Sequence, residues 1–264
     1  MDPPLRLGPC IGVFDSGIGG LSVLRELRRT LAEARLLYVA DSGHAPYGER
    51  SDAAIVARAR HIAGHLRAAG AELLVIACNT ATAAAVQALR DADPALPVVG
   101  IEPGLKPAIV RTRNGRIGVM ATTATLASAG FGRLLQRHAA GSALTLQSCT
   151  GLADAIEAGP LDSPLIARRI AQHTQPLRAA DCDVVVLGCT HYALVAPAIQ
   201  AALGPQVVLI DTAAAVARHT ATRAAALPRR SSAGLAMWSS GDAQALADFA
   251  ARWLGMRVRV AALP

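Results

Sequence analysis

The sequence nearly repeats itself, and this repeat limits how the chain can fold more than any other feature does. One continuous apolar run, 73–77, leads directly into Cys78, and a second run, 184–188, leads directly into Cys189. Continuous rather than alternating apolar runs are typical of strands that are buried on both faces of a parallel sheet. The chain therefore presents one thiol at the end of a central strand in each of two related halves.

A second pair of segments repeats at nearly the same distance along the chain. The segment 11–16 returns as 117–122, and Ser22 is echoed by Ser128. Because both repeats have the same order, each half is expected to carry one central strand followed later by a strand that ends in a cysteine. This pattern suits an enzyme that removes a proton from one face of a molecule and returns a proton to the other.

Short apolar runs alternate with amphipathic stretches rich in alanine and arginine along the whole chain. Strands that alternate with helices build parallel sheets with helices on both faces. The fold class that we predict is α/β, with two pseudo-symmetric, doubly wound domains and mostly parallel sheets. The predicted strands are 10–14, 36–40, 73–77, 98–101, 116–121, 143–147, 183–188, 207–210, 235–239 and 257–260. The helices that are most easily placed are 21–32, 51–69, 81–91 and 163–177.

The repeat also predicts the limits of the two domains. The first domain is expected to comprise 1–100 and 213–264, because the last two predicted strands have no counterpart in the second repeat. The second domain is expected to comprise 101–212, and the chain enters it through a proline-containing crossing at 97–116.

The carboxyl ends of the strands are where a ligand is expected to bind, as in other open parallel sheets. Cys78, Cys189 and Asp15 all fall at such ends. We therefore expect the active site in the cleft between the two domains.

The formal net charge of +7 raises the question of nucleic-acid binding. The basic residues are almost all arginines, with Lys106 the only lysine, and they occur singly or in pairs such as Arg28-Arg29. Aromatic residues make up only 3% of the chain, so base-stacking side chains do not interleave with the basic ones. We expect no nucleic acid as the primary partner, and a positive field that attracts small anions is the simpler interpretation.

The ends and cysteines of the sequence bear on its compartment. The segment 1–6 lacks the features of a signal peptide, and no apolar run approaches the length of about 18 residues that spans a bilayer. The 5 cysteines are odd in number and show no CxxC spacing, which argues against a disulfide framework and against a metal site. We expect a cytoplasmic protein with reduced thiols, no membrane partner and no bound metal.

The paired cysteines are the strongest candidates for chemistry. Cys10, Cys149 and Cys182 have no partner in the repeat and are interpreted as small buried residues. Cys78 and Cys189 each precede polar residues that open a helix, where backbone N–H groups stabilise anions. A thiolate at such a place is a usable general base.

A glycine-rich turn, 15–20, follows the first predicted strand. It lacks the GxGxxG order and the Walker lysine, so nucleotide binding is weakly supported. We interpret it as a tight turn whose N–H groups and Ser16 hydroxyl hold a carboxylate. Asp15 either binds a substrate ammonium, tunes a thiol or caps the following helix. His191, two residues after Cys189, is placed to assist the ionisation of that thiol.

At this point the chain resembles the glutamate racemase family, within the cofactor-independent aspartate/glutamate racemase superfamily. The resemblance covers nearly the whole length, and several motifs occur in the family's order and spacing. These motifs are Ile11 to Leu21, Asp41-Ser42, Pro46-Tyr47-Gly48, Ala77 to Thr82, Gly100 to Pro103, and Gly188 to Tyr192.

The resemblance implies roles for particular residues. Cys78 and Cys189 match the two catalytic cysteines, one for each face of the α-carbon, and no cofactor is implied. Asp15, His191 and Glu157 match residues that support those thiols. The substrate-binding positions that it implies are Asp15, Ser16, Tyr47, Gly48, Asn79, Thr80, Thr122, Thr125, Thr190 and His191. A homodimer and the supply of D-glutamate for bacterial peptidoglycan are also implied.

Three other functions are compatible with parts of this pattern. Racemisation of aspartate or another acidic amino acid needs the same thiols and a pocket of different depth. A cysteine hydrolase or transferase needs one nucleophile rather than a matched pair. A binding module with this fold is favoured only where a thiol is missing, and both are present here.

Overall fold

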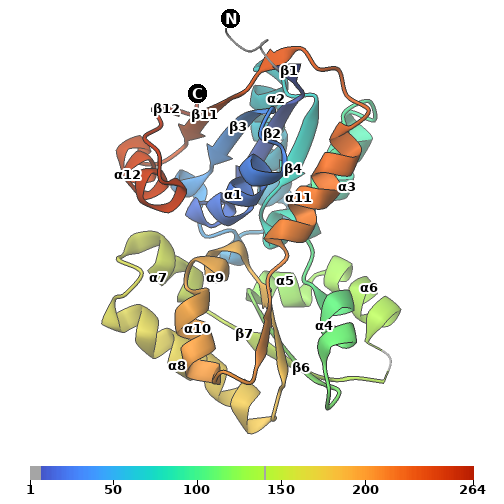
Figure 1. Cartoon of the computed structure of the whole chain (residues 1–264), viewed down its shortest axis with the longest axis vertical. Helices are drawn as coiled ribbons and strands as arrows, with labels where there is room; N and C mark the ends of the chain where they lie inside the picture. Colours follow the sequence, from blue (N-terminus) through green and yellow to red (C-terminus); the bar gives the residue numbers. More distant parts are fainter. Residues whose placement is uncertain (1–6, 140) are drawn as a thin grey trace, which may run out of the picture. The chain divides into compact units, whose positions relative to one another are not determined.

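The computed structural model describes residues 7–139 and 141–264. The chain forms two compact units, shown in Figure 1. The first unit comprises the residues up to Ile101 together with Ala213–Pro264, and the second comprises Glu102–Thr212.

The first unit is built on a six-stranded sheet with the order β12-β11-β3-β2-β4-β5, and every neighbouring pair is parallel. Its strands are β2 (Cys10–Asp15), β3 (Arg35–Ala40), β4 (Leu73–Ile76), β5 (Val98–Gly100), β11 (Gly234–Ser239) and β12 (Val260–Ala262). Its helices are α1 (Leu21–Thr30), α2 (Asp52–Ala68), α3 (Asn79–Ala92), α11 (Ala213–Ala224) and α12 (Ala243–Leu254), with 3-10 turns η1 (Ile18–Gly20), η2 (Ser42–His44) and η3 (Tyr47–Glu49). A short antiparallel pair, β1 (Leu7–Gly8) and β10 (Ser231–Ser232), lies beside the sheet.

Both faces of this sheet are covered by helices. The helices α1 and α11 lie side by side in front of the strands in Figure 1, and α2 packs against α3. Buried side chains of α2 and α3, such as Ile62 and Ala85, form one core with Phe14, Leu37 and Ile76 of the strands. Burial on two faces explains why β2 is apolar throughout rather than alternating.

The second unit has a four-stranded parallel sheet with the order β7-β6-β8-β9. Its strands are β6 (Arg116–Ala121), β7 (Ala143–Ser148), β8 (Val184–Gly188) and β9 (Val208–Ile210). Its helices are α4 (Leu105–Arg111), α5 (Thr123–Ala127), α6 (Ala129–His138), α7 (Leu152–Ala158), α8 (Pro164–Ala179), α9 (Thr190–Leu194) and α10 (Ala196–Leu203). Ile117, Val119 and Val186 of the strands pack with Leu105 and Phe131 in its core.

The two units share one topology, as the sequence repeat predicts. The order β3-β2-β4-β5 of the first unit matches β7-β6-β8-β9 of the second, and β2 and β6 are the repeated central strands. The echoed serines also have equivalent roles, because Ser22 Oγ donates to Gly19 O and Ser128 Oγ donates to Thr125 O, both at 2.8 Å. The predicted α/β class with two mostly parallel sheets is confirmed.

The end of β5 is tied to α3 at the place where the chain leaves the first unit. Thr82 Oγ1 accepts a hydrogen bond from Ile101 N at 3.1 Å and donates to Ile76 O at 3.4 Å. A Cβ on Gly100 would lie 2.5 Å from Cγ2 of Thr82, so this close contact requires glycine. The crossing therefore begins from a fixed point on the first sheet.

Two details of the predicted elements are wrong. The last strand was expected at 257–260, and it is β12 instead, beginning at Val260. Gly255 ends α12 with a φ of 67°, and the following residues cross to β11 before pairing starts at Val260 opposite Met237. The antiparallel pair of β1 and β10 has no apolar run in the sequence that would indicate it.

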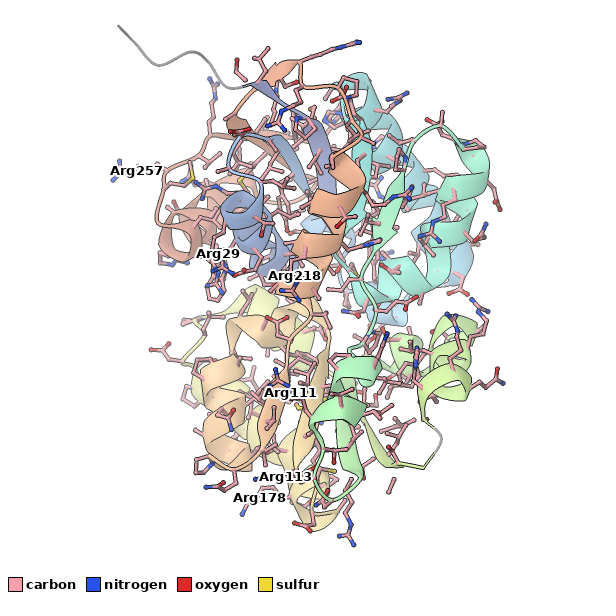
Figure 2. The ribbon with its side chains drawn as sticks, turned by 45° about the vertical axis from the view of Figure 1, so that its right-hand side comes forward. Arg29, Arg111, Arg113, Arg178, Arg218 and Arg257 are labelled. Atoms are coloured by element: carbon pink, nitrogen blue, oxygen red, sulfur yellow. The ribbon has the colours of Figure 1, made fainter. Side chains whose placement is uncertain are left out.

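The arginines come from separate elements rather than from one segment. Arg29 on α1, Arg218 on α11 and Arg257 before β12 are examples in the first unit, and Figure 2 labels them. Within 7–139 and 141–264, no helix is long and apolar enough to cross a membrane.

Ile117 tests the packing of the second unit. Its side chain is fully buried between β6 and the covering helices, so Ile117→Ala should lower the free energy of unfolding by about 2–5 kcal/mol. Val110 on α4 is 78% exposed, and Val110→Ala is the control, with an expected change within about 0.5 kcal/mol. Urea unfolding followed by circular dichroism measures both, and equal effects would contradict the assigned core.

Candidate active site

Cys78 lies at the carboxyl end of β4, where it caps α3. Its side chain is 5% exposed, and its Sγ accepts a hydrogen bond from Ala81 N at 3.4 Å. The hydroxyl of Ser16 lies 3.6 Å from the same sulfur. The thiol therefore meets a helix N-terminus on one side and a hydroxyl on the other, and both stabilise negative charge on sulfur.

Asp15 organises the turn that brings Ser16 to this thiol. Its carboxylate is fully buried at the end of β2, and Oδ1 accepts from Ser16 Oγ at 3.0 Å and from Gly17 N at 3.1 Å. A Cβ on Gly20 would lie 2.5 Å from Cβ of Asp15 and 2.8 Å from the hydroxyl of Tyr38. The glycine-rich sequence thus allows η1 to pack directly over Asp15, which fits a tight turn rather than a nucleotide loop.

Asn79 and Thr80 open α3 immediately after the thiol and are both buried. The amide oxygen of Asn79 is buried and has no hydrogen-bond partner among the residues that the structure describes. A buried polar atom without a protein partner is unfavourable unless a ligand or water satisfies it. Asn79 is therefore a strong candidate for contact with a substrate ammonium.

Tyr47 and Gly48 lie in η3, on the segment that follows β3. Tyr47 is 2% exposed and packs in the same buried core as Cys78. Burial raises the pKa of Tyr47, and the charges of Asp41 and Cys78 raise it further. The phenol stays protonated, and its hydroxyl donates to Asp41 Oδ2 at 2.6 Å.

Cys189 occupies the equivalent place in the second unit, between β8 and α9. Its thiol is 8% exposed, and its Sγ lies 3.8 Å from Nδ1 of His191. The other ring nitrogen of His191 is 2.7 Å from Oε2 of Glu157, which α7 carries. The structure thus places Cys189, His191 and Glu157 in one line of contacts.

The charge state of His191 follows from its two partners. Burial acts to lower its pKa, but the hydrogen bonds and negative charges of Cys189 and Glu157 outweigh burial and raise the pKa well above its ordinary value. His191 is therefore an imidazolium at neutral pH. A positive charge beside Cys189 favours the thiolate form of that cysteine.

Thr122 and Thr125 lie at the carboxyl end of β6, at the start of α5. Thr122 Oγ1 donates to Thr125 Oγ1 at 2.9 Å and accepts from Thr125 N at 3.1 Å. Thr190, the first residue of α9, is 5% exposed beside Cys189. These three hydroxyls belong to the second unit, as do Cys189, His191 and Glu157.

The sequence-predicted residues therefore fall into two groups, one in each unit. The structure brings together Asp15, Ser16, Tyr47 and Cys78 within the first unit, with Gly48, Asn79 and Thr80 adjacent in sequence. Asp15 reaches Cys78 through Ser16 rather than directly in the contacts described.

A third cysteine, Cys149, lies beside the second group and was interpreted from sequence as a buried residue without chemistry. It is 2% exposed, and burial together with the charge of Cys189 raises the pKa of its thiol to about 12. The hydroxyl of Tyr192 donates to Cys149 O at 3.4 Å. Cys149 thus remains a neutral thiol in the packing around Cys189. No pattern in the sequence separated it from Cys10 or Cys182.

No group of three or more histidine, cysteine, aspartate or glutamate side chains in the described parts of the chain is arranged to hold a metal ion. All 5 cysteines are free and buried.

Comparison with known proteins gives the same family from sequence and from structure. The family model for Asp/Glu/hydantoin racemase matches residues 11–220. The chain is 47% identical to the glutamate racemase of Ectopseudomonas mendocina over 253 residues, which is 95% of this chain and 96% of that protein. It is 53% identical to the glutamate racemase of Pseudomonas entomophila over 79% of each chain.

Two solved structures are similar over 97% of both chains. Glutamate racemase isoform RacE1 from Bacillus anthracis has a TM-score of 0.88 and 32% identity. Escherichia coli glutamate racemase, in complex with L-glutamate and the activator UDP-MurNAc-ala, has a TM-score of 0.86 and 30% identity.

The raised pKa of Cys149 makes a prediction about its reactivity. At pH 8 a thiol with a pKa of about 12 is ionised in only about one molecule in 10⁴, so iodoacetamide should alkylate Cys149 about 10³-fold more slowly than it alkylates glutathione. Mass spectrometry of the Cys149 peptide after timed labelling measures this rate. Labelling in urea is the control, because unfolding removes the burial, and a rate like that of glutathione in the folded protein would contradict the assignment.

Proposed function

The chain belongs to the Asp/Glu/hydantoin racemase family, and we propose that it interconverts L-glutamate and D-glutamate by a two-base reaction on Cys78 and Cys189. The observation that carries the proposal is the equivalence of the two thiols. Each follows a central strand of its own unit, and each begins a helix. Each unit is one domain in this proposal, and the substrate binds in the cleft between them.

The reaction needs one thiolate and one thiol at a time. The thiolate takes the α-proton of glutamate, and the electron pair of the broken C–H bond stays on the α-carbon. The opposite thiol then donates its proton to the other face of that carbon, so the two cysteines exchange protonation states as the substrate inverts. Proton transfers of this kind require groups within hydrogen-bond reach of the carbon, one on each side.

Hydrogen-bond donors in both units are suited to holding the substrate carboxylates. The turn at Ser16 and Gly17 and the helix starts at Thr80 and Thr190 present hydroxyl or backbone N–H groups. Aimed donors of this kind stabilise the negative charge that develops on the α-carbon and its carboxylate. The scheme assigns no step to a cofactor.

The two thiols are supported by different groups, which gives the site its asymmetry. Cys78 has a helix N–H and the hydroxyl of Ser16, whereas Cys189 has the imidazolium of His191, which Glu157 holds. The cysteine that starts as thiolate depends on which enantiomer is bound. Loss of one support therefore changes the turnover of the two enantiomers by different factors.

Glutamate is favoured over aspartate by the relatives. Those at 47% and 53% identity are glutamate racemases, and the similar structure from Escherichia coli holds L-glutamate. The product D-glutamate would serve peptidoglycan synthesis. A homodimer and a cytoplasmic location belong to the same proposal, and sedimentation velocity of the purified protein tests the dimer.

The proposal is tested by incubating the purified protein with L-glutamate or D-glutamate, without added cofactor, and following circular dichroism. We expect either enantiomer to reach the racemate, with L-aspartate turned over far more slowly. Cys78→Ser and Cys189→Ser should each nearly abolish racemisation in both directions, because every turnover needs both groups. Wild-type turnover in either variant would exclude the two-base scheme, and faster turnover of aspartate would favour the alternative substrate.

Glu157→Gln tests the support of Cys189. Removing the carboxylate lowers the pKa of His191, so its proton, held below the raised pKa and lost as the pH rises through it, is lost at a lower pH. The alkaline limb of kcat/KM should move to lower pH, and kcat should fall by up to about 10²-fold, unequally for the two enantiomers. Haldane's relation keeps kcat/KM equal in the two directions. Asp162→Asn at an exposed neighbouring position is the control, and an unshifted limb in Glu157→Gln would contradict the role.

A further inference from the structure

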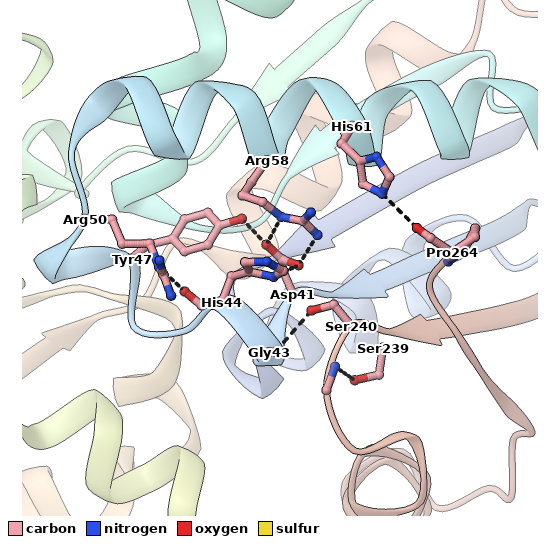
Figure 3. A network of polar contacts seen from close by, with 11 residues as sticks. Asp41, Gly43, His44, Tyr47, Arg50, Arg58, His61, Ser239, Ser240 and Pro264 are labelled. Carbon is pink, nitrogen blue, oxygen red and sulfur yellow. Dashed lines mark hydrogen bonds and ion pairs between the residues drawn. The ribbon is translucent and has the colours of Figure 1, made fainter.

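A buried ion pair lies next to the Cys78 group and has no assigned role so far. The carboxylate of Asp41 is fully buried after β3, and Arg58 on α2 donates to it twice, from Nη2 to Oδ1 at 2.7 Å and from Nε to Oδ2 at 3.0 Å (Figure 3). The guanidinium is 22% exposed, so its charge is only partly screened by water. Two parallel donors of this kind fix the orientation of a carboxylate as well as its charge.

Other groups converge on the same carboxylate. The hydroxyl of Tyr47 donates to Oδ2 at 2.6 Å, and Nδ1 of His44 is 3.1 Å from Oδ1. Ser240, after β11, hydrogen-bonds to the carboxyl and also accepts from Gly43 N at 3.1 Å. Three separate parts of the first unit, namely the segment after β3, α2 and the turn after β11, therefore meet at Asp41 (Figure 3).

Asp41 is stable as a buried anion because of these donors. Burial acts to raise its pKa, but the hydrogen bonds from Arg58, Tyr47 and Ser240, together with the Arg58 charge, outweigh burial and lower it. Arg58 contributes both a hydrogen bond and a charge to this balance, which the neutral donors do not. Removing the guanidinium would leave a buried carboxylate without a counterion, and the segment around it would rearrange to reach water.

The consequence reaches Cys78 through Tyr47. One end of Tyr47 is held by Asp41, and its ring packs in the buried core that contains Cys78. The two side chains are close enough that the charge of Cys78 affects the phenol. The orientation of Tyr47 thus defines one wall of the space around this thiol.

We propose that Arg58 is a positioning residue for the Cys78 half of the site, acting through Asp41 to hold Tyr47 against the thiol. This inference rests on the proposed racemase function, since it assigns Arg58 a role in that reaction. Arg58 itself contacts Asp41 rather than Cys78 in the described contacts, so its effect on the reaction is indirect. Small displacements of a positioning group lower rates strongly, by about 10²-fold for an error of about 1 Å.

The test compares Arg58→Gln and Arg58→Lys with Arg60→Gln, which changes an exposed arginine on the same helix. Arg58→Gln should lower kcat/KM for both enantiomers by about 10²-fold. Arg58→Lys keeps the charge and loses the two-pronged geometry, so its loss should be intermediate. Arg60→Gln should match the wild type, and an Arg58→Gln variant that also matches it would overturn the proposal.

A double-mutant cycle separates positioning from general destabilisation. Tyr47→Phe removes the hydroxyl contact with Asp41, so its loss and that of Arg58→Lys should be strongly non-additive in kcat/KM. Arg58→Lys combined with Glu157→Gln, in the other unit, should be additive. The lysine variant keeps the cycle decisive if Arg58→Gln does not fold. Additive losses for Arg58→Lys and Tyr47→Phe would overturn the proposal.

A readout without turnover distinguishes this inference from the proposed function. A loosened Tyr47 should expose Cys78, so iodoacetamide should alkylate the Cys78 peptide at least about 10-fold faster in Arg58→Gln, or in Arg58→Lys, than in Arg60→Gln. An increase in a protein that does not racemise glutamate would leave the positioning role standing and reject the proposed function alone. Equal alkylation rates together with normal racemisation would reject the positioning role alone.

Discussion

Every strand of the two main sheets runs parallel to its neighbours, and this constraint determines where chemistry can occur in each unit. In a parallel sheet all the strands end at one edge, and helices begin there. Polar residues that would be unfavourable inside the sheet therefore collect at that edge, where helix N-termini satisfy them. Asp15 and Cys78 end adjacent strands of one sheet, and Thr122 and Cys189 end adjacent strands of the other.

The sequence predicted the strands and the paired thiols because both leave local patterns. A run such as 184–187 has too many branched apolar residues in succession for an exposed element, and its helix start is marked by the polar residues after Cys189. The order β3-β2-β4-β5 and its copy then follow from the repeat. The roles of the individual site residues stay predictions that the kinetic experiments address.

What the sequence could not predict depends on contacts between segments that are far apart in the chain. Nothing near Arg58 marks it among the 26 basic residues, because its partner Asp41 lies on another element. Cys149 gives no signal either, since its raised pKa comes from burial and from the neighbouring Cys189. The start of β12 at Val260 was missed because a left-handed turn at Gly255 leaves no apolar signature.

The second unit has a neutral counterpart of the Arg58 contact. On α8, His173 lies 3.2 Å from Thr150 O through Nε2 and 3.2 Å from Gln147 through Nδ1, and burial lowers its pKa. A neutral ring with the proton on Nε2 satisfies both contacts, so α8 holds the turn after β7 without a charge. The same topology therefore anchors the turn after the corresponding strand by an ion pair in one unit and by a neutral imidazole in the other.

The contact between Thr82 and Gly100 has a consequence for the natural variation of this sequence. Any side chain at position 100 would collide with the methyl group of Thr82, whose hydroxyl also holds the backbone of Ile101. A change at position 100 alone is therefore unfavourable, whereas a smaller residue at position 82 would make room and give up part of the anchor. Among descendants of this chain, positions 82 and 100 should covary, although one lies in a helix and the other at the end of a strand.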